Sequence, residues 1–115
     1  MQRDRLVLAE MIEAAERAIS LVSGQTILDL EQDETRRDAI LWNFTVLGEA
    51  AGQISDEVRE HHAGVAWQNA IGLRNRIVHG YWSIDLEILH TTATEVLPGF
   101  VAALRSVVES DFPDA

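Results

Sequence analysis

The chain has 115 residues, of which 47% are hydrophobic, and we expect one domain, residues 1–115, around a single apolar core. Its net charge is −10 and its nine basic residues are all arginine, which argues against a general affinity for nucleic acids. The chain has no cysteine, which excludes disulfide bonds and thiolate metal sites. No apolar run approaches the roughly 18 residues that span a bilayer, and charges interrupt the N-terminal segment. We therefore expect a cytoplasmic protein without a signal peptide or a membrane partner.

The first half of the chain predicts two long amphipathic helices. Apolar residues recur every three or four positions over residues 5–22 and again over residues 33–54, with a short turn or helix at 26–30 between them. Small residues gather at 48–52, where a second helix can approach the backbone closely. Glu49 lies in this patch and has two interpretations: a solvated helix carboxylate, or a carboxylate that orients an arginine of another helix.

The segments after this helix are shorter. Ser55 is a good N-cap for a short helix over residues 56–61. His61 and His62 are adjacent, so they point to different faces and make a poor chelate, and we interpret both as surface residues. A helix over residues 67–79 follows, as the spacing of its apolar residues indicates.

The last predicted helix begins at a cap formed by Ser83 or Asp85 and runs to about Glu109. Its apolar stripe stays in phase across Pro98, so we expect a kink there rather than a break. Residues 111–115 are expected to form a loose tail. Because no segment has the period of a strand, the sequence predicts an all-α fold, an up-and-down bundle of about four main helices plus short connecting helices.

The segment Leu73–Trp82, LRNRIVHGYW, gathers side chains suited to binding and catalysis. It lies in a window from Ala63 to Ile84 that contains no Asp or Glu, although the chain has 19 acidic residues. We therefore expect a locally cationic surface on an acidic protein. Gly80 is expected to end the helix in the left-handed conformation. The basic side chains are either solvated helix residues or an anion-binding site, and they are Arg74, Arg76 and His79.

The spacing of Arg74 and His79 does not bring them together on one helix. Five positions along a regular helix correspond to about 140° around its axis, whereas Arg76 and His79 share a face. In a two-fold dimer in which this helix packs against its own copy, Arg74 of one chain can lie near His79 of the other. We expect a homodimer in which the two Arg74–His79 pairs line a shared cleft.

The run from Arg74 to Tyr81, RNRIVHGY, resembles the R-x4-H-x-Y signature of HepT-like proteins in the HEPN superfamily, with Asn75 as the polar residue after the arginine. The resemblance covers most of the chain from about Asp38 onward, although Trp82 departs from it. It implies a small helical bundle that dimerises. Many members are ribonuclease toxins that pair with a minimal nucleotidyltransferase antitoxin, an arrangement known as a type VII toxin–antitoxin system. Further matching positions are Trp67, Gly48-Glu49-Ala50, Ile84-Asp85 and Leu97-Pro98.

A ribonuclease that uses no metal needs a group for proton transfer and a group for the phosphate. His79 suits proton transfer because the pKa of imidazole lies near neutral pH, and Arg74 suits the phosphate because its guanidinium donates two hydrogen bonds and stays charged. The resemblance implies the same two catalytic residues, no cofactor, RNA as substrate, and products with a 2′,3′-cyclic phosphate. We expect Asn75, Arg76 and Glu49 to support them.

Tyr81 has a separate implied role. In HepT-like toxins the motif tyrosine accepts adenylyl groups from the partner enzyme, and an added phosphate at Tyr81 would compete for the cations that cleavage needs. We expect Arg74, Arg76 and His79 to lower the pKa of Tyr81 from about 10. The alternative is that Tyr81 stacks on an RNA base or packs against the protein.

Two other classes of function stay open. The first is a catalytically silent helical dimer that acts as the binding partner of a nucleotidyltransferase. The second is a carboxylate-bridged metal site, because Glu87 and His90 form a Glu-x-x-His step. We favour it least, because Glu87 and His90 flank the apolar stripe of their helix.

Overall fold

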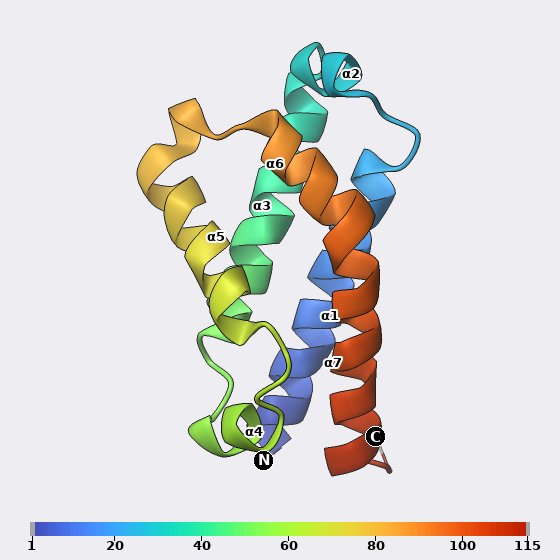
Figure 1. Ribbon diagram of the computed structural model, residues 1–115, viewed down its shortest axis with the longest axis vertical. Helices are drawn as coiled ribbons and strands as arrows, with labels where there is room; N and C mark the ends of the chain where they lie inside the picture. The colour runs from blue at the N-terminus through green and yellow to red at the C-terminus, as the bar shows by residue number, and fades with distance from the viewer. Residues whose placement is uncertain (1, 115) are drawn as a thin grey trace.

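The computed structural model describes residues 2–114, apart from the side chains of Gln2 and Trp82, and the regular structure in this range is helical. Four long helical stretches run up and down a molecule of 43 × 27 × 21 Å (Figure 1). The predicted all-α bundle is confirmed. The elements are α1 (Gln2–Val22), α2 (Ile27–Glu31), α3 (Glu34–Ala51), α4 (Asp56–His61), α5 (Trp67–Gly80), the 3₁₀ turn η1 (Tyr81–Ser83), α6 (Leu86–Thr91), the π-helical segment η2 (Thr92–Val96) and α7 (Leu97–Asp111).

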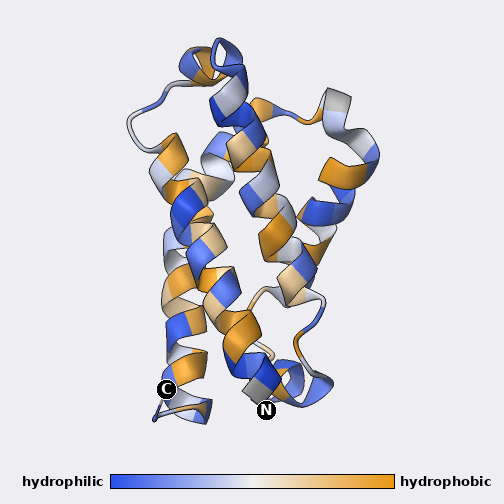
Figure 2. Ribbon diagram, turned by 180° about the vertical axis from the view of Figure 1, so that it is seen from behind, coloured by the Kyte–Doolittle hydropathy of each residue, from blue (hydrophilic) through white to orange (hydrophobic). Residues whose placement is uncertain are grey.

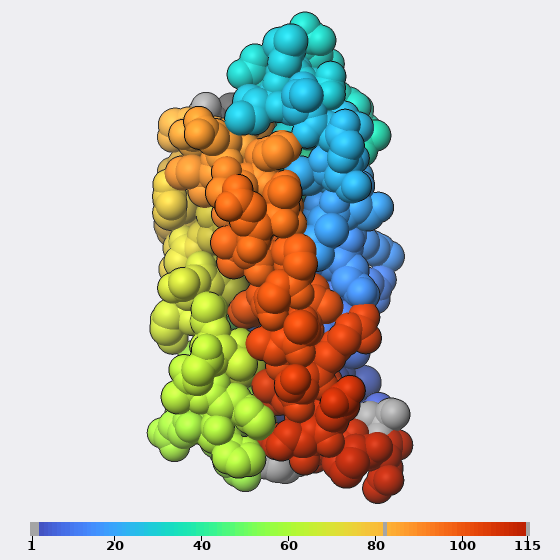
Figure 3. All heavy atoms as spheres, turned by 45° about the vertical axis from the view of Figure 1, so that its right-hand side comes forward, coloured from blue at the N-terminus to red at the C-terminus, as the bar shows by residue number. Residues whose placement is uncertain are grey.

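The core lies between α1, α3 and α7, and α5 packs on the other side of α3 (Figure 1). Apolar and polar residues are interleaved along the long helices, as amphipathic helices require (Figure 2). The space-filling view shows α6 and α7 running from below the α2 end of the molecule to its opposite end, between α1 and the α4–α5 side (Figure 3). Among the described helices, none combines the length and apolar character needed to cross a membrane. The largest fully buried side chains are Phe44, Leu8, Met11, Leu30, Ile40, Leu89, Leu104 and Val107.

Polar side chains define both ends of α3, the central helix. Asp33 caps the N-terminus by accepting a hydrogen bond from the backbone N–H of Arg36 at 3.0 Å, which confirms the predicted start. The helix ends at Ala51, earlier than the predicted Ile54, because the N–H groups of Gln53 and Ile54 bond to carbonyls three positions back. Arg59 then donates to the Ala51 carbonyl oxygen at 3.0 Å and to that of Ile54 at 3.1 Å.

The short helix α4 is fixed to the start of α1. Ser55 caps it as predicted, accepting from the N–H of Val58 at 3.3 Å. The carboxylate of Asp4, buried in α1, accepts from the N–H of Ser55 at 2.9 Å and from its hydroxyl at 2.8 Å. Burial raises the pKa of Asp4, but the hydrogen bonds from Ser55 are among the interactions that outweigh it, so the pKa is lowered.

The C-terminal helical stretch contains the predicted irregularity. Asp85 caps α6 by accepting from the N–H of Glu87 at 2.9 Å. The wider turn of η2 immediately precedes α7, which carries Pro98 in its first turn, so the helix bends without breaking. The predicted loose tail at 111–115 is wrong at its first residue, because Asp111 completes α7 and its side chain is bonded to His62. Ala115 lies outside the described residues.

Candidate active site

α5 approaches α3 very closely at Gly48. A Cβ atom built on Gly48 would lie 2.2 Å from the Cβ atom of Arg74 and 2.6 Å from the carbonyl oxygen of Ala70. Carbon atoms in contact are normally 3.5–4.0 Å apart, so only glycine permits this approach. The expected close helix contact at the small-residue patch is therefore present at Gly48, and the stem of Arg74 lies directly across it.

The guanidinium of Arg74 is half-buried and held on one side. One terminal nitrogen, Nη2, lies 3.0 Å from Oε2 of Glu49, and the other, Nη1, donates to Oδ1 of Asn75 at 3.0 Å. The remaining nitrogen, Nε, is buried and has no hydrogen-bond partner among the described atoms. Glu49 thus contacts the motif arginine, which agrees with its interpretation as a carboxylate that orients an arginine of another helix.

His79 and Arg76 are exposed on the last turns of α5. In the part of the chain that the structure describes, no hydrogen bond or ion pair joins Arg74 to His79. The two side chains leave α5 in different directions, since Arg74 contacts α3 at Gly48 and Glu49. One copy of the chain therefore carries the two predicted catalytic groups on one helix, but it does not bring them into contact.

The end of α5 differs from the prediction. Gly80 has φ −139° and belongs to the helix, so the expected left-handed conformation is wrong; among the described residues Gly24 is the glycine with positive φ. The chain instead tightens into η1, where the hydroxyl of Ser83 donates to the Gly80 carbonyl oxygen at 3.2 Å. This turn directs Tyr81 back toward α3. The side chain of Trp82, whose role the sequence left open, lies outside the description.

Tyr81 contacts an acidic residue rather than the arginines beside it in sequence. Its hydroxyl donates a hydrogen bond to Oδ1 of Asp38 on α3. This hydrogen bond, together with partial desolvation and the charges of Asp38 and Glu34, raises the pKa of Tyr81 above 10, although Arg37 opposes the shift. The expectation that neighbouring cations lower this pKa is wrong. Its premise, an acid-free surface, fails because α3 supplies carboxylates to the segment in space.

Helices α3 and α5 together present an exposed apolar surface on their outer side. Trp42 on α3 is 65% exposed and Val78 on α5 is 48% exposed. Together with Tyr81 they line a shallow hollow whose other lining residues are Asp38, Leu41, Thr45 and Ile77. Exposed aromatic side chains beside a cleft are typical of contact surfaces.

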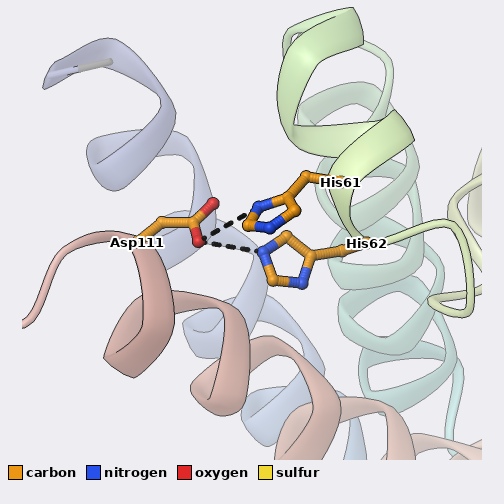
Figure 4. A group of neighbouring side chains, drawn as sticks. All are labelled: His61, His62 and Asp111. Atoms are coloured by element: carbon orange, nitrogen blue, oxygen red, sulfur yellow. Dashed lines mark hydrogen bonds and ion pairs between the residues drawn. The ribbon is translucent and has the colours of Figure 1, made fainter.

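The histidines at the end of α4 also differ from the prediction. His61 and His62 do not diverge but both turn toward Asp111 at the end of α7 (Figure 4). The reason is that His62 leaves the helical conformation, with φ −122° and ψ 51°, so the helical spacing argument does not apply to it. The useful signal in the sequence was the position of both residues at a predicted helix end, where the backbone can turn.

The residues of the alternative metal site do not converge. His90 bonds through Nε2 to the backbone carbonyl oxygen of Gln25 at 2.8 Å, which connects α6 to the loop after α1. Glu87 is exposed in the first turn of α6. Within the described residues, neither belongs to a group of side chains spaced to hold a metal ion.

The chain is similar in sequence to several proteins whose names describe ribonucleases. "Putative RNase TTE0752" from Caldanaerobacter subterraneus subsp. tengcongensis is 23% identical over 111 residues, which cover 96% of this chain and 99% of that protein. "Putative RNase MJ1380" from Methanocaldococcus jannaschii is 28% identical over 91 residues, 79% of this chain and 84% of its own length. "Probable ribonuclease HepT" from Thermococcus cleftensis is 24% identical over 66 residues, 57% and 60% of the two chains. No solved structure matches the chain.

The family comparison extends over nearly the whole bundle. The model of the family described as "Ribonuclease HepT-like" matches residues 11–107, from the middle of α1 to the end of α7. This range contains α3, α5 and each of the motif residues discussed above. The helical fold, the motif and the family match thus agree, and the chain belongs to the ribonuclease HepT-like family.

Proposed function

We propose that this protein is a metal-independent endoribonuclease that acts as the toxin of a type VII toxin–antitoxin system. The observation that carries the proposal is the placement of Arg74. Its stem is fixed against Gly48, its head is oriented by Glu49 and Asn75, and His79 lies further along the same helix. An oriented arginine and an accessible imidazole are the two kinds of group that phosphodiester cleavage needs.

In the proposed reaction the ribose 2′-oxygen attacks the adjacent phosphorus and the bond from phosphorus to the 5′-oxygen breaks. The proton leaves the 2′-hydroxyl to a base, and the departing 5′-oxygen takes up a proton, which gives a 2′,3′-cyclic phosphate and a 5′-hydroxyl. His79 serves these proton transfers. Arg74 donates to the phosphate oxygens as negative charge develops on them, in exchange for part of its contact with Glu49. Arg76, exposed on the same helix, adds positive charge for the RNA backbone.

The proposed active form is a homodimer through the exposed face of α3 and α5. Trp42 and Val78 supply the apolar surface for such an interface, and both lie beside the motif helix. A two-fold axis through this face places His79 of one copy near Arg74 of the other, which compensates for their divergence on one helix. Trp42→Asp should therefore convert a dimer to a monomer in sedimentation, whereas a wild-type monomer at micromolar concentration would contradict the arrangement.

The proposed antitoxin is a minimal nucleotidyltransferase that adenylylates Tyr81. The phenol oxygen attacks the α-phosphorus of ATP, pyrophosphate leaves, and the phenol proton passes to Asp38, which already accepts a hydrogen bond from it. Asp38 as a base replaces the activation by cations that the sequence led us to expect. The added adenylate brings phosphate charge to the end of α5, where it competes with RNA for the basic side chains.

The test is an RNA cleavage assay in excess EDTA with matched substitutions. Arg74→Ala and His79→Ala should each lower the cleavage rate by about 10²–10³. Arg105→Ala and His90→Ala remove the same residue types elsewhere and should cleave at the wild-type rate. Tyr81→Phe should cleave RNA but resist silencing by the partner and ATP, with the adenylate on wild-type Tyr81 located by mass spectrometry. Full activity of Arg74→Ala or His79→Ala, or a strict metal requirement, would reject the proposed chemistry.

A catalytically silent dimer is the second candidate. It is favoured by the engagement of both terminal nitrogens of Arg74 with Glu49 and Asn75, which leaves few donors for a phosphate. A purified wild-type dimer that binds the nucleotidyltransferase but cleaves no RNA would select this candidate.

A further inference from the structure

A second polar cluster lies at the end of the molecule where α4 meets α7, and the proposed ribonuclease chemistry does not use it. The side chains of His61, His62 and Asp111 turn toward one another across the gap between these two helices (Figure 4). We propose that they form a binding site for a divalent transition-metal ion such as zinc, which links α4 to the end of α7.

The spacing of the donor atoms fits such an ion. Oδ1 of Asp111 lies 3.0 Å from Nε2 of His62 and 3.5 Å from Nδ1 of His61. Each of the three residues offers one ligand atom such that the three atoms lie within 4.8 Å of one another. In a tetrahedral zinc site with bonds of about 2.0–2.1 Å, two ligand atoms are separated by about 3.3 Å. Small side-chain rotations are therefore sufficient to place one ion in contact with all three groups.

The ligand types select the class of metal. Two imidazoles and one carboxylate suit zinc, cobalt, nickel or copper, whereas calcium and magnesium prefer sites built from oxygen atoms. Three protein ligands leave a fourth position for water. Each imidazole binds a metal ion through a nitrogen that carries no proton, so metal ions and protons compete for the site.

The cluster is held in place on one side and open on the other. The side chains of His62 and Asp111 are 18% and 16% exposed, and the carbonyl oxygen of His62 accepts hydrogen bonds from Nε1 of Trp67 at 3.1 Å and from the N–H of Val65 at 3.0 Å. His61 is 67% exposed, so an ion can enter from solvent.

The site is separate from the proposed catalytic residues. It adjoins Trp67 at the start of α5, whereas His79 lies at the other end of this helix, roughly 20 Å away at 1.5 Å per residue. The ion would therefore act on stability, by joining the short helix α4 to the last turn of α7. RNA cleavage that persists in EDTA is compatible with this role.

The experiment uses tag-free protein, because a polyhistidine tag binds the same metals. After treatment with EDTA and dialysis, zinc is titrated by calorimetry, and thermal unfolding is recorded with and without zinc. One zinc ion should bind per chain, and Tm should rise on the order of 10 °C when free zinc exceeds its dissociation constant a hundredfold. Cobalt in place of zinc should give the intense visible absorption of a four-coordinate site.

Two substitutions keep the proposal testable without relying on an unfolded variant. His61→Ala removes an exposed ligand, and Asp111→Asn keeps the size and a hydrogen-bond acceptor while weakening a ligand; each should weaken zinc binding at least tenfold with an unchanged circular dichroism spectrum. His90→Ala is the matched control and should bind zinc as wild type does. Saturable binding that survives His61→Ala, a weak and non-saturable isotherm, or one zinc ion for two chains would overturn the proposed site.

Discussion

Substitution of Gly48 by alanine tests the contact on which the placement of Arg74 depends. To restore a normal carbon–carbon distance of 3.5–4.0 Å from the present 2.2 Å, α5 has to move away from α3 by about 1.3–1.8 Å. A rotamer change cannot relieve the clash, because Ala70 contributes a backbone oxygen at 2.6 Å. Overpacking of this kind costs about 1–3 kcal/mol, whereas alanine gains about 1 kcal/mol over glycine in a helix. The net change should be a loss of stability of about 0–2 kcal/mol.

The matched control is Gly72→Ala on α5, because a Cβ atom there meets nothing within 4 Å. This variant should gain about 1 kcal/mol, so urea unfolding should separate the two variants by about 1–3 kcal/mol. A displacement of more than 1 Å at a catalytic residue costs about 10²-fold in rate, so Gly48→Ala should also lose most RNA cleavage. If Gly48→Ala is as stable as Gly72→Ala and cleaves RNA at the wild-type rate, the tight contact does not position the arginine.

The remaining predictions concern two carboxylates with tertiary partners, those of Asp4 and Asp38. The pKa of Asp4 is lower in the folded state than its unfolded value of about 3.9, so the stability that Asp4 contributes is complete above about pH 5 and is lost as the pH falls through the folded pKa. Asp4→Asn should therefore flatten the acid dependence of the free energy of unfolding, measured with urea. An unchanged pH profile would count against this role of Asp4. Asp38→Asn should lower the pKa of Tyr81 toward about 10, which ultraviolet titration of the single tyrosine can follow, with an unaltered titration as the opposing result.

The features of this fold that were predicted correctly depend on residues close to one another in the sequence. The cap at Ser55 and the start of α3 at Asp33 were predictable because a side-chain oxygen there bonds an N–H three positions later. The all-α fold was predictable because the spacing of apolar residues along each helix is also a local pattern. The bond from Ser55 to Asp4 could not be foreseen, because it joins residues 51 positions apart and no local pattern marks it.

The errors at the candidate site arose where tertiary contacts outweighed local preference. Gly80 can adopt a left-handed conformation, but the hydrogen bond from Ser83 and the contact of Tyr81 with Asp38 stabilise a 3₁₀ turn instead. The pKa of Tyr81 was misjudged because sequence neighbours were taken as spatial neighbours. The placement of Glu49 was easier to anticipate, because a small-residue patch indicates where another helix comes close.

The attachment of α5 to the rest of the bundle has a consequence for how the motif behaves in solution. Among the described helices, α3 is the long helix on which α5 packs extensively. The buried side chains of α5 are Trp67 at its start and Ile77 near its end. We expect such a helix to open at lower free energy than α1 or α3 and its amide hydrogens to exchange sooner. A second copy bound at Trp42 and Val78 would slow this opening. The order of α5 would then increase with protein concentration. Dimer formation and the precise placement of the motif residues would thus be linked through local unfolding.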